Sequence, residues 1–330
     1  MRVAVLSSTL FGYRCIVEGI LPLSGVQIAG ILTTPKQIQI SYSEKPVEIK
    51  THADFTPLAD SAECEVAVLT GKVDGNAYLR YLNEWSVDFI LALGWYYMVP
   101  RKVRNAVPLG CAGIHASLLP KYRGGAPIPW AIINGENETG VSFFYFEDGV
   151  DDGDIIGQKR FPIDDSETWV DVYNKAEDAS VDLLGTFLPK IKDGSAPRIA
   201  QNHELATYVD QRKPQDGLIS WRSMKAREAY NFIRAQVPPY PGAFSVLGDM
   251  KVIFSKVCQP FWEDNGKRIA GQFYTIHSVP NTFGVCCADG VTLPVNEVIL
   301  VKGNEETVCS AEEFMRSYNS SVDSFMFCEV

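Results

Sequence analysis

The chain has 330 residues, 46% of them hydrophobic, and a formal net charge of −10 at pH 7. This length predicts two domains, or one large domain with an appendix, and the composition supplies a sizeable core. Proteins whose main partner is RNA or DNA usually carry a basic face, so the acidic balance argues against that class. No apolar run reaches the ~18–20 residues of a membrane span.

The N-terminal stretch 1–14 has a short apolar run that breaks at Ser7 and Ser8, so we expect a first strand and turn rather than a signal peptide. The eight cysteines are dispersed and form no CxxC pair. Reduced thiols in a cytoplasmic protein are therefore expected, rather than a disulfide framework or a metal site.

Strands alternate with helices through the first half of the chain. Short apolar runs predict buried strands, and the stretches between them, such as Asn76–Trp85, have helical spacing. This alternation predicts a mostly parallel sheet with helices on both faces, and ligands bind such sheets at the carboxyl ends of the strands. The predicted strands are Arg2–Ser8, Val26–Thr34, Glu65–Thr70, Val87–Gly94, Cys111–Ser117, Thr139–Phe146 and Ile155–Ile163.

Beyond the last of these strands, Glu167–Lys192 predicts a long helix, and the polar stretch Ala196–Pro214 is interpreted as a linker. A helix is expected over Ser223–Gln236, ended by Pro238–Pro241. From Ala243 onward, short β-type runs predict a small β-rich domain. These runs are 243–248, 251–257, 272–279, 282–288 and 291–300.

His115 is the first residue that indicates chemistry. It stands at the end of a predicted buried strand, directly before the Gly- and Pro-rich stretch Leu118–Pro129, which is expected to be a loop. An imidazole exchanges protons near neutral pH, so this position suits an acid–base catalyst. A structural histidine satisfied within the strand is the alternative.

The turn Glu147–Asp154 holds five carboxylates in eight residues. It is either a solvated turn or, if it lies near His115, the source of a carboxylate that orients the imidazole. A calcium loop of the EF-hand type is disfavoured, because counting from Asp148 puts Lys159 where that loop needs a glutamate.

Together these segments resemble the folate-dependent formyltransferase family. The resemblance covers nearly the whole chain, through His115–Gly124, Asn134–Val141, Val150–Asp154, Gln211–Trp221 and Ile233–Phe244. It implies an α/β fold, with a Rossmann-like catalytic domain (residues 1–200) that binds N10-formyltetrahydrofolate. It also implies a smaller C-terminal β-rich, OB-like domain (residues 201–330).

The resemblance also implies roles for individual residues. His115 falls on the family's catalytic histidine, and Asp151 on the aspartate that tunes it. The segment Tyr97, Met98 and Val99 matches the backbone that reads the pteridine ring. Two loops would close over the folate, namely Ser117, Leu118, Leu119 and Pro120, and Glu147, Asp148, Gly149 and Val150. No metal is expected.

The chain departs from the family pattern at Gly113. The family usually has an asparagine here, whose amide stabilises the developing oxyanion, and losing one such donor typically costs ~10²–10³ in rate. Backbone N–H groups, protonated His115 or a water are alternatives for that task. The hydrolase domain of formyltetrahydrofolate dehydrogenase also lacks the asparagine and shares a Leu10-Phe11-Gly12-like turn, which keeps hydrolysis open.

By resemblance to sugar N-formyltransferases, the expected acceptor is the amine of an amino sugar linked to a nucleotide. Methionyl-tRNA is the alternative, disfavoured because residues 250–330 hold six Lys/Arg against ten Asp/Glu and Pro35–Lys50 has three Lys and two Glu. Residues proposed to contact a phosphate, a sugar carboxylate or a ring are Arg14, Lys121, Arg212, Lys213 and Tyr240. A further position, an arginine in some sugar enzymes, is Gly125. A folate-binding module without catalysis and a homodimer also remain open.

Overall fold

In the computed structural model, the described residues are 1–39, 46–70, 75–262, 268–276, 278–318 and 326–327. They form two compact units. The first comprises Met1–Pro127, Thr139–Phe161 and Asn174–Val209, and the second comprises Ile128–Glu138, Pro162–Tyr173 and Asp210–Val330. The sequence-based division at residue 200 stays a prediction, although residues 201–209 pack with the first unit.

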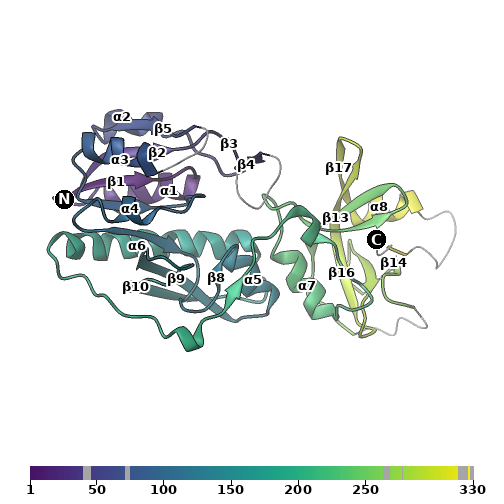
Figure 1. Cartoon of the computed structure of the whole chain (residues 1–330). Coiled ribbons are helices and arrows are strands. Elements are labelled where there is room, and N and C mark those ends of the chain that lie inside the picture. Colours follow the sequence, from purple (N-terminus) through teal and green to yellow (C-terminus); the bar gives the residue numbers. More distant parts are fainter. Residues whose placement is uncertain (40–45, 71–74, 263–267, 277, 319–325, 328–330) are drawn as a thin grey trace. The chain divides into compact units, whose positions relative to one another are not determined.

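A seven-stranded sheet forms the centre of the first unit (Figure 1), in the order β10-β9-β7-β6-β1-β2-β5. The five strands from β7 to β5 in this order pair in parallel, whereas β9 runs antiparallel to β7. The strands are β1 (Arg2–Leu6), β2 (Gln27–Thr33), β5 (Glu65–Val68), β6 (Phe89–Ala92), β7 (Cys111–His115), β9 (Glu138–Tyr145) and β10 (Ile155–Pro162). Each begins and ends within two residues of its prediction.

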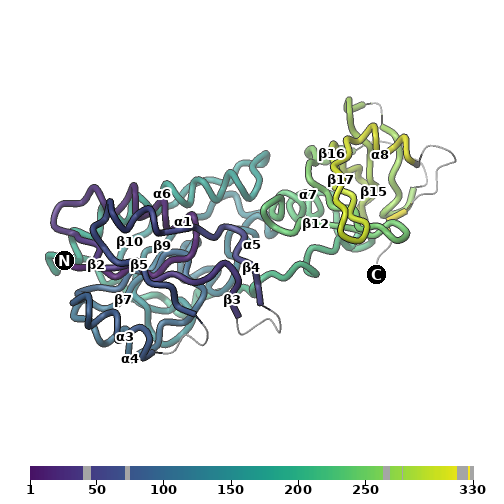
Figure 2. The backbone as a smooth tube through the Cα atoms, turned by 90° about the horizontal axis from the view of Figure 1, so that it is seen from above, coloured from purple at the N-terminus to yellow at the C-terminus, as the bar shows by residue number. Residues whose placement is uncertain are grey.

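Helices cover both faces of this sheet (Figure 2). On one face, Tyr78 and Leu82 of α3 and Val103 of α4 pack with Ala4 and Leu6 of β1. On the other face lies α6, the predicted long helix. The helices and turns of this part of the chain are α1 (Leu10–Arg14), the π-helix η1 (Cys15–Ile20), α2 (Thr56–Ser61), α3 (Gly75–Glu84), α4 (Arg101–Arg104), α5 (Pro127–Ile133) and α6 (Trp169–Lys192).

Glycines allow close approaches on the α6 face. A Cβ at Gly157 of β10 would lie 2.2 Å from the Phe187 ring of α6, and one at Gly19 of η1 would lie 3.4 Å from Leu184. The α6 helix therefore packs directly on β10 and η1. This three-layer arrangement confirms the predicted Rossmann-like α/β fold.

Two expectations about loops were wrong. The stretch Leu118–Pro129 is not wholly a loop, because α5 begins at Pro127, where a missing N–H costs nothing in the first helical turn. The stretch Ala196–Pro214 is not a free linker up to residue 209. It contains η2 (His203–Leu205) and β11 (Tyr208–Val209), and β11 pairs in parallel with β8 (Arg123–Gly124).

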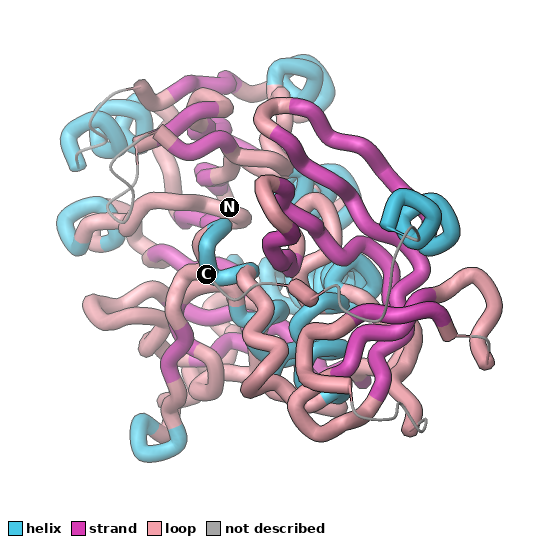
Figure 3. The backbone as a smooth tube through the Cα atoms, turned by 90° about the vertical axis from the view of Figure 1, so that its right-hand side faces the viewer, coloured by secondary structure: helices cyan, strands magenta, loops and turns pink. Residues whose placement is uncertain are grey.

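The second unit is built on an antiparallel sheet in the order β12-β13-β16-β15-β14, with β17 paired to β16. Figure 3 shows these strands in magenta. This sheet confirms the predicted β-rich C-terminal domain, although residue 277 of one predicted run lies outside the described residues. The elements are η3 (Pro214–Gly217), α7 (Ala226–Arg234), β12 (Ala243–Leu247), β13 (Met250–Val257), β14 (Phe273–Thr275), β15 (Phe283–Cys286), β16 (Thr292–Lys302), β17 (Glu305–Ser310) and α8 (Ala311–Tyr318).

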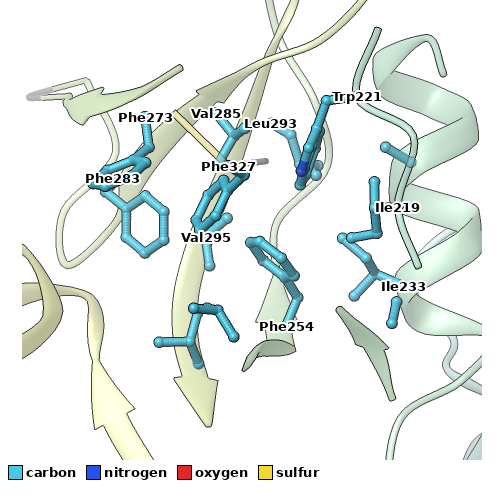
Figure 4. Packing of buried hydrophobic residues seen from close by; sticks show 14 of the residues in the cluster. Ile219, Trp221, Ile233, Phe254, Phe273, Phe283, Val285, Leu293, Val295 and Phe327 are labelled. Atoms are coloured by element: carbon cyan, nitrogen blue, oxygen red, sulfur yellow. The ribbon is translucent and has the colours of Figure 1, made fainter. Parts of the chain in front are cut away.

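Aromatic side chains fill the core of the second unit (Figure 4). The rings of Trp221 and Phe254 meet edge to face at 5.3 Å between centroids, and Phe327 contacts both. The buried indole N–H of Trp221 donates to Ser245 Oγ at 2.7 Å, so the polar end of this ring is satisfied. A short pair of strands, β3 (Gln37–Ile38) and β4 (Val47–Glu48), completes the described elements of the chain.

Candidate active site

The strand order reverses beside β1. The chain passes from β1 to β2 on one side and, after β5, returns at β6 on the other side of β1. The segments that follow β1 and β6 touch, because a Cβ at Gly12 of α1 would lie 2.8 Å from the Leu93 carbonyl and one at Gly94 would lie 2.1 Å from Thr9 Oγ1. Such a reversal is where open α/β sheets bind ligands.

His115 ends β7, the strand next to β6, and its side chain is 10% exposed. Its Nε2 lies 2.7 Å from the carbonyl oxygen of Tyr122. A carbonyl oxygen only accepts, so Nε2 carries a proton and donates a hydrogen bond to the Tyr122 carbonyl. The ring also meets Phe144 edge to face, at 6.4 Å between centroids.

The acidic turn after β9 brings Asp151 to His115. The register places Tyr145, at the end of β9, opposite Ala112 rather than His115, so the turn folds back toward the histidine. Asp151 Oδ2 then lies 3.6 Å from His115 Nδ1 and accepts the Gly124 N–H at 2.8 Å. At 3.6 Å the two atoms are too far apart for a hydrogen bond, and they form an ion pair only when the ring is protonated.

The segment that follows β6 carries the residues predicted to read a pteridine ring. Tyr97 packs against the buried pair Ile38 and Ile49, and burial raises the pKa of its hydroxyl. Met98 is 70% exposed, whereas Val99 is buried in the core beneath the loop. An exposed thioether beside the strand reversal offers an adaptable apolar surface to a planar ring.

Hydrogen bonds hold the predicted loop Ser117–Pro120 in place. Ser117 Oγ donates to the Lys121 carbonyl at 2.6 Å, and Ser142 Oγ donates to the Ser117 carbonyl and accepts the Leu119 N–H. Gln158 Nε2 donates to the Leu119 carbonyl at 2.9 Å. Leu118 packs over Gly140, where an added Cβ would lie 2.5 Å from it. The loop after His115 is therefore fixed by β9 and β10.

The predicted loop Glu147–Val150 is anchored by arginines. Asp148 is bound by Arg101 and by Arg104, whose Nη2 lies 2.5 Å from Asp148 Oδ1. Arg104 is 8% exposed, and its Nε and Nη1 have no hydrogen-bond partner among the described residues. Val150 is 50% exposed beside them.

Gly113 lies on β7 with the ring of Phe146 against it. A Cβ at Gly113 would lie 2.6 Å from Phe146 Cζ and 2.8 Å from the Ala92 carbonyl oxygen. The aromatic ring thus fills the space that a longer side chain would need. Neither residue 113 nor residue 146 has a polar side chain, so the Phe146 ring stands where the resemblance would place the asparagine amide.

The two basic residues predicted near a phosphate in the first unit differ. Arg14 pairs with Glu18 and Glu177 at 3.1 Å and with Asp178 at 2.5 Å, and these hydrogen bonds hold its pKa above the usual range. Three carboxylates outnumber its single charge. Lys121 is exposed and forms no ion pair within the described parts of the chain.

Arg212, Lys213 and Tyr240 belong to the second unit. The Arg212 guanidinium lies over the rings of Trp130 and Phe232, at 5.0 and 5.3 Å from their centroids, and burial lowers its pKa. It also donates to the Asp216 carbonyl at 2.6 Å. Lys213 is exposed.

Tyr240 meets Trp169 edge to face at 4.9 Å, so the predicted stacking aromatic already has an aromatic neighbour within its own unit.

Among the described residues, no group of three or more His, Cys, Asp or Glu side chains is arranged to hold a metal ion. Seven cysteines are free thiols, and Cys328 lies outside the described residues. No helix in the described ranges is both long and apolar enough to span a bilayer.

Sequence reasoning missed several residues around this pair. Arg123 is 1% exposed and Gln201 is 6% exposed, and both join the Asp151 turn to the loop after His115. Phe146 was missed as well. Arg123 and Gln201 carry polar side chains in polar stretches, so no hydropathy pattern marks them as buried.

The class of the protein follows from the family models that match both parts of the chain. The chain belongs to the formyl transferase family, since the family model for formyl transferase matches residues 1–188 and the model for the formyl transferase C-terminal domain matches residues 212–319. The predicted family, that of the folate-dependent formyltransferases, is confirmed.

Solved structures share this fold at low identity. HypX from Aquifex aeolicus in complex with tetrahydrofolic acid matches with a TM-score of 0.62 and 15% identity, over 99% of this chain and 50% of that chain. The chain thus spans about half the length of HypX. An N-formyltransferase from Helicobacter canadensis, in complex with folinic acid and dTDP-3-aminofucose, matches with a TM-score of 0.62 and 19% identity, over 89% of this chain and 98% of that chain. Methionyl-tRNA formyltransferase from Clostridium thermocellum matches with 0.54 and 19% identity, over 82% and 96%.

Proposed function

We propose that this chain transfers the formyl group of N10-formyltetrahydrofolate to the amine of an amino sugar linked to a nucleotide. The observation that carries the proposal is the position of His115 and Asp151, 3.6 Å apart, next to the strand reversal between β1 and β6. Acyl transfer to an amine requires a proton-transferring side chain at the place where the ligand binds.

The residues around the strand reversal fit a folate. Exposed apolar side chains follow β1, β6 and β9 in the chain, with Leu10 57%, Met98 70% and Val150 50% exposed. A heterocycle bound against them would remove apolar surface from water. Arg104 adds a buried guanidinium whose Nε and Nη1 have no partner among the described residues. The folate, when bound, supplies the formyl group.

The proposed reaction balances in protons. The amine nitrogen attacks the formyl carbon, the bond from that carbon to N10 breaks, and the proton leaving the amine ends on N10. His115 Nε2, which starts protonated, gives its proton to N10 as the bond to the formyl carbon breaks and then takes up the proton that leaves the amine, and Asp151 stabilises the imidazolium form of the ring. Since Nε2 donates to Tyr122 before substrate binds, this nitrogen must exchange the Tyr122 carbonyl for the substrate during the reaction.

Two other acceptors remain. Water as the acceptor, which would make the enzyme a formyltetrahydrofolate hydrolase, is favoured by one observation, the Phe146 ring against Gly113. Without a side-chain amide there, His115 has to supply more of the oxyanion stabilisation. Methionyl-tRNA is less favoured, because the net charge of −10 opposes binding of a polyphosphate.

The test is an acceptor screen. The protein is incubated with formyltetrahydrofolate and, separately, with amino sugars linked to dTDP or UDP, methionyl-tRNA, or no acceptor, and products are identified by mass spectrometry. We expect an N-formylated sugar nucleotide. Formate released at the same rate without any amine would support the hydrolase, and formyl-methionyl-tRNA formation would support the tRNA enzyme. Folate binding without any product would leave only a binding module.

A further inference from the structure

Gln201 is a buried amide that uses its whole hydrogen-bonding capacity at the candidate active site. Its Nε2 donates to the carbonyl oxygens of Asp151 at 2.9 Å and Gly153 at 2.7 Å. Its Oε1 accepts from Arg123, with Nη2 at 2.6 Å and Nε at 3.2 Å. One side chain therefore joins the acidic turn to the loop after His115.

Residues 122–124 lie on the other side of this bridge and hold His115 and Asp151. The Tyr122 carbonyl accepts His115 Nε2 at 2.7 Å, and the Gly124 N–H donates to Asp151 Oδ2 at 2.8 Å. Arg123, between them, is held by Gln201. A shift of either segment would therefore change the separation of His115 and Asp151.

The acidic turn needs such support. Asp151 has a φ of +50°, in the left-handed region that residues other than glycine adopt uncommonly. Gly153 packs closely, because an added Cβ would lie 1.9 Å from the Tyr145 carbonyl. The two carbonyls that Gln201 binds flank this constrained stretch, so the amide holds the turn where its own geometry is restrictive.

Arg123 depends less on Gln201 than the turn does. Its Nη1 donates to Tyr208 Oη at 3.0 Å, and its Nη2 lies 3.2 Å from His203 Nδ1. The arginine thus keeps two further partners if Gln201 is removed. The main consequence of losing the amide is expected at residues 151–153.

We propose that Gln201 is a positioning residue, which holds Asp151 in place to orient His115. This proposal rests on the proposed catalytic role of His115 and Asp151. The amide never touches the reacting atoms. It acts by fixing the acidic turn against residues 122–124.

The first test is a double-mutant cycle with Asp151. Gln201→Met keeps the length of the side chain and removes its hydrogen bonds, and Gln201→Glu keeps an acceptor for Arg123 but removes the donors. Each single variant is expected to lower kcat about 10- to 100-fold with KM changed less than about threefold, since small misplacements are costly. In an Asp151→Asn background the same substitutions should change kcat less than about twofold.

Tyr208→Phe is the matched control, because it removes one partner of Arg123 and leaves the Gln201 amide in place. It should retain kcat within about twofold. An unchanged kcat in both Gln201 variants, or the same fold loss with and without Asp151, would overturn the positioning role. Gln201→Glu keeps the test open if Gln201→Met does not fold.

A second measurement separates this proposal from the proposed function. The ring signals of His115 are followed by NMR through a pH titration, assigned with His115→Asn, in the protein without substrate. In Gln201→Glu they should move toward those of Asp151→Asn, whatever the acceptor proves to be. Signals identical to those of the unmodified chain would contradict the positioning role even if formyl transfer is confirmed.

Discussion

The ring of Phe146 occupies the space beside Gly113, where any added Cβ would lie 2.6 Å from its Cζ atom. The same Cβ would also lie 2.8 Å from the main-chain oxygen of Ala92, which cannot move without shifting β6. Gly113 and Phe146 are therefore coupled by size. The candidate active site has an aromatic wall on this side of β7 and must work without a polar side chain there.

This coupling predicts that Gly113→Asn destabilises the fold. Overpacking of this kind costs about 1–3 kcal/mol, and urea unfolding should show a lower midpoint with an unchanged m-value. Adding Phe146→Leu should recover part of the loss, because the ring gives way while the Ala92 oxygen does not. A double variant that loses the sum of the two single effects would contradict the coupling.

Arg104 and Asp148 should respond unequally to substitution. Asp148→Asn leaves the buried guanidinium without its carboxylate and should lower the unfolding free energy by about 1–3 kcal/mol. Arg104→Met removes a charge whose Nε and Nη1 have no partner among the described residues, and should change stability by less than about 1 kcal/mol.

The control for this pair is Arg101→Met, since Arg101 is the second and exposed partner of Asp148. An exposed ion pair contributes little, so urea unfolding should be nearly unchanged. A larger loss of unfolding free energy in Arg104→Met than in Asp148→Asn would contradict this prediction, because the guanidinium would then stabilise the fold by more than its pairing with Asp148. Binding of formyltetrahydrofolate by Asp148→Asn, measured by calorimetry, should weaken because the loop 147–150 loses its anchor.

Variants of Lys121 and Arg14 should show which of these residues contacts a phosphate of the substrate and which one stabilises the fold. Lys121→Ala is expected to raise the KM of a phosphate-bearing acceptor about 10-fold with kcat unchanged and stability unaffected, because the charge is exposed and uncommitted to an ion pair in the described chain. Arg14→Met should leave that KM unchanged and lower the unfolding temperature, since it leaves Glu18, Glu177 and Asp178 facing one another. The reverse pattern would reassign the phosphate contact to Arg14.

The sequence predicts the layers of this protein well and its polar network poorly. Apolar runs such as 111–117 mark the buried strands, because burial on both faces demands them. Gln201 and Arg123 left no such mark, since their burial depends on partners far apart in the chain, such as Asp151. The same holds for Phe146, which resembles any strand aromatic until Gly113 is seen against it.

His115 was predicted from its chemistry and its strand-end position, and Asp151 from the resemblance to the formyltransferase family; the structure places them 3.6 Å apart. The register of β9 alone would place the turn away from His115, because Tyr145 lies opposite Ala112. The turn reaches His115 only because it folds back and is held there. A fold-back of this kind is a property of tertiary contacts rather than of local sequence.

The most direct test of the account is the formyl-transfer rate of His115→Asn and Asp151→Asn at saturating formyltetrahydrofolate and the acceptor found in the screen. Calorimetry on the same proteins checks that folate binding is retained within about threefold. The account predicts a fall in kcat of about 10²–10⁴-fold for His115→Asn and a smaller fall for Asp151→Asn. Turnover within about threefold of the unmodified protein in His115→Asn would contradict it.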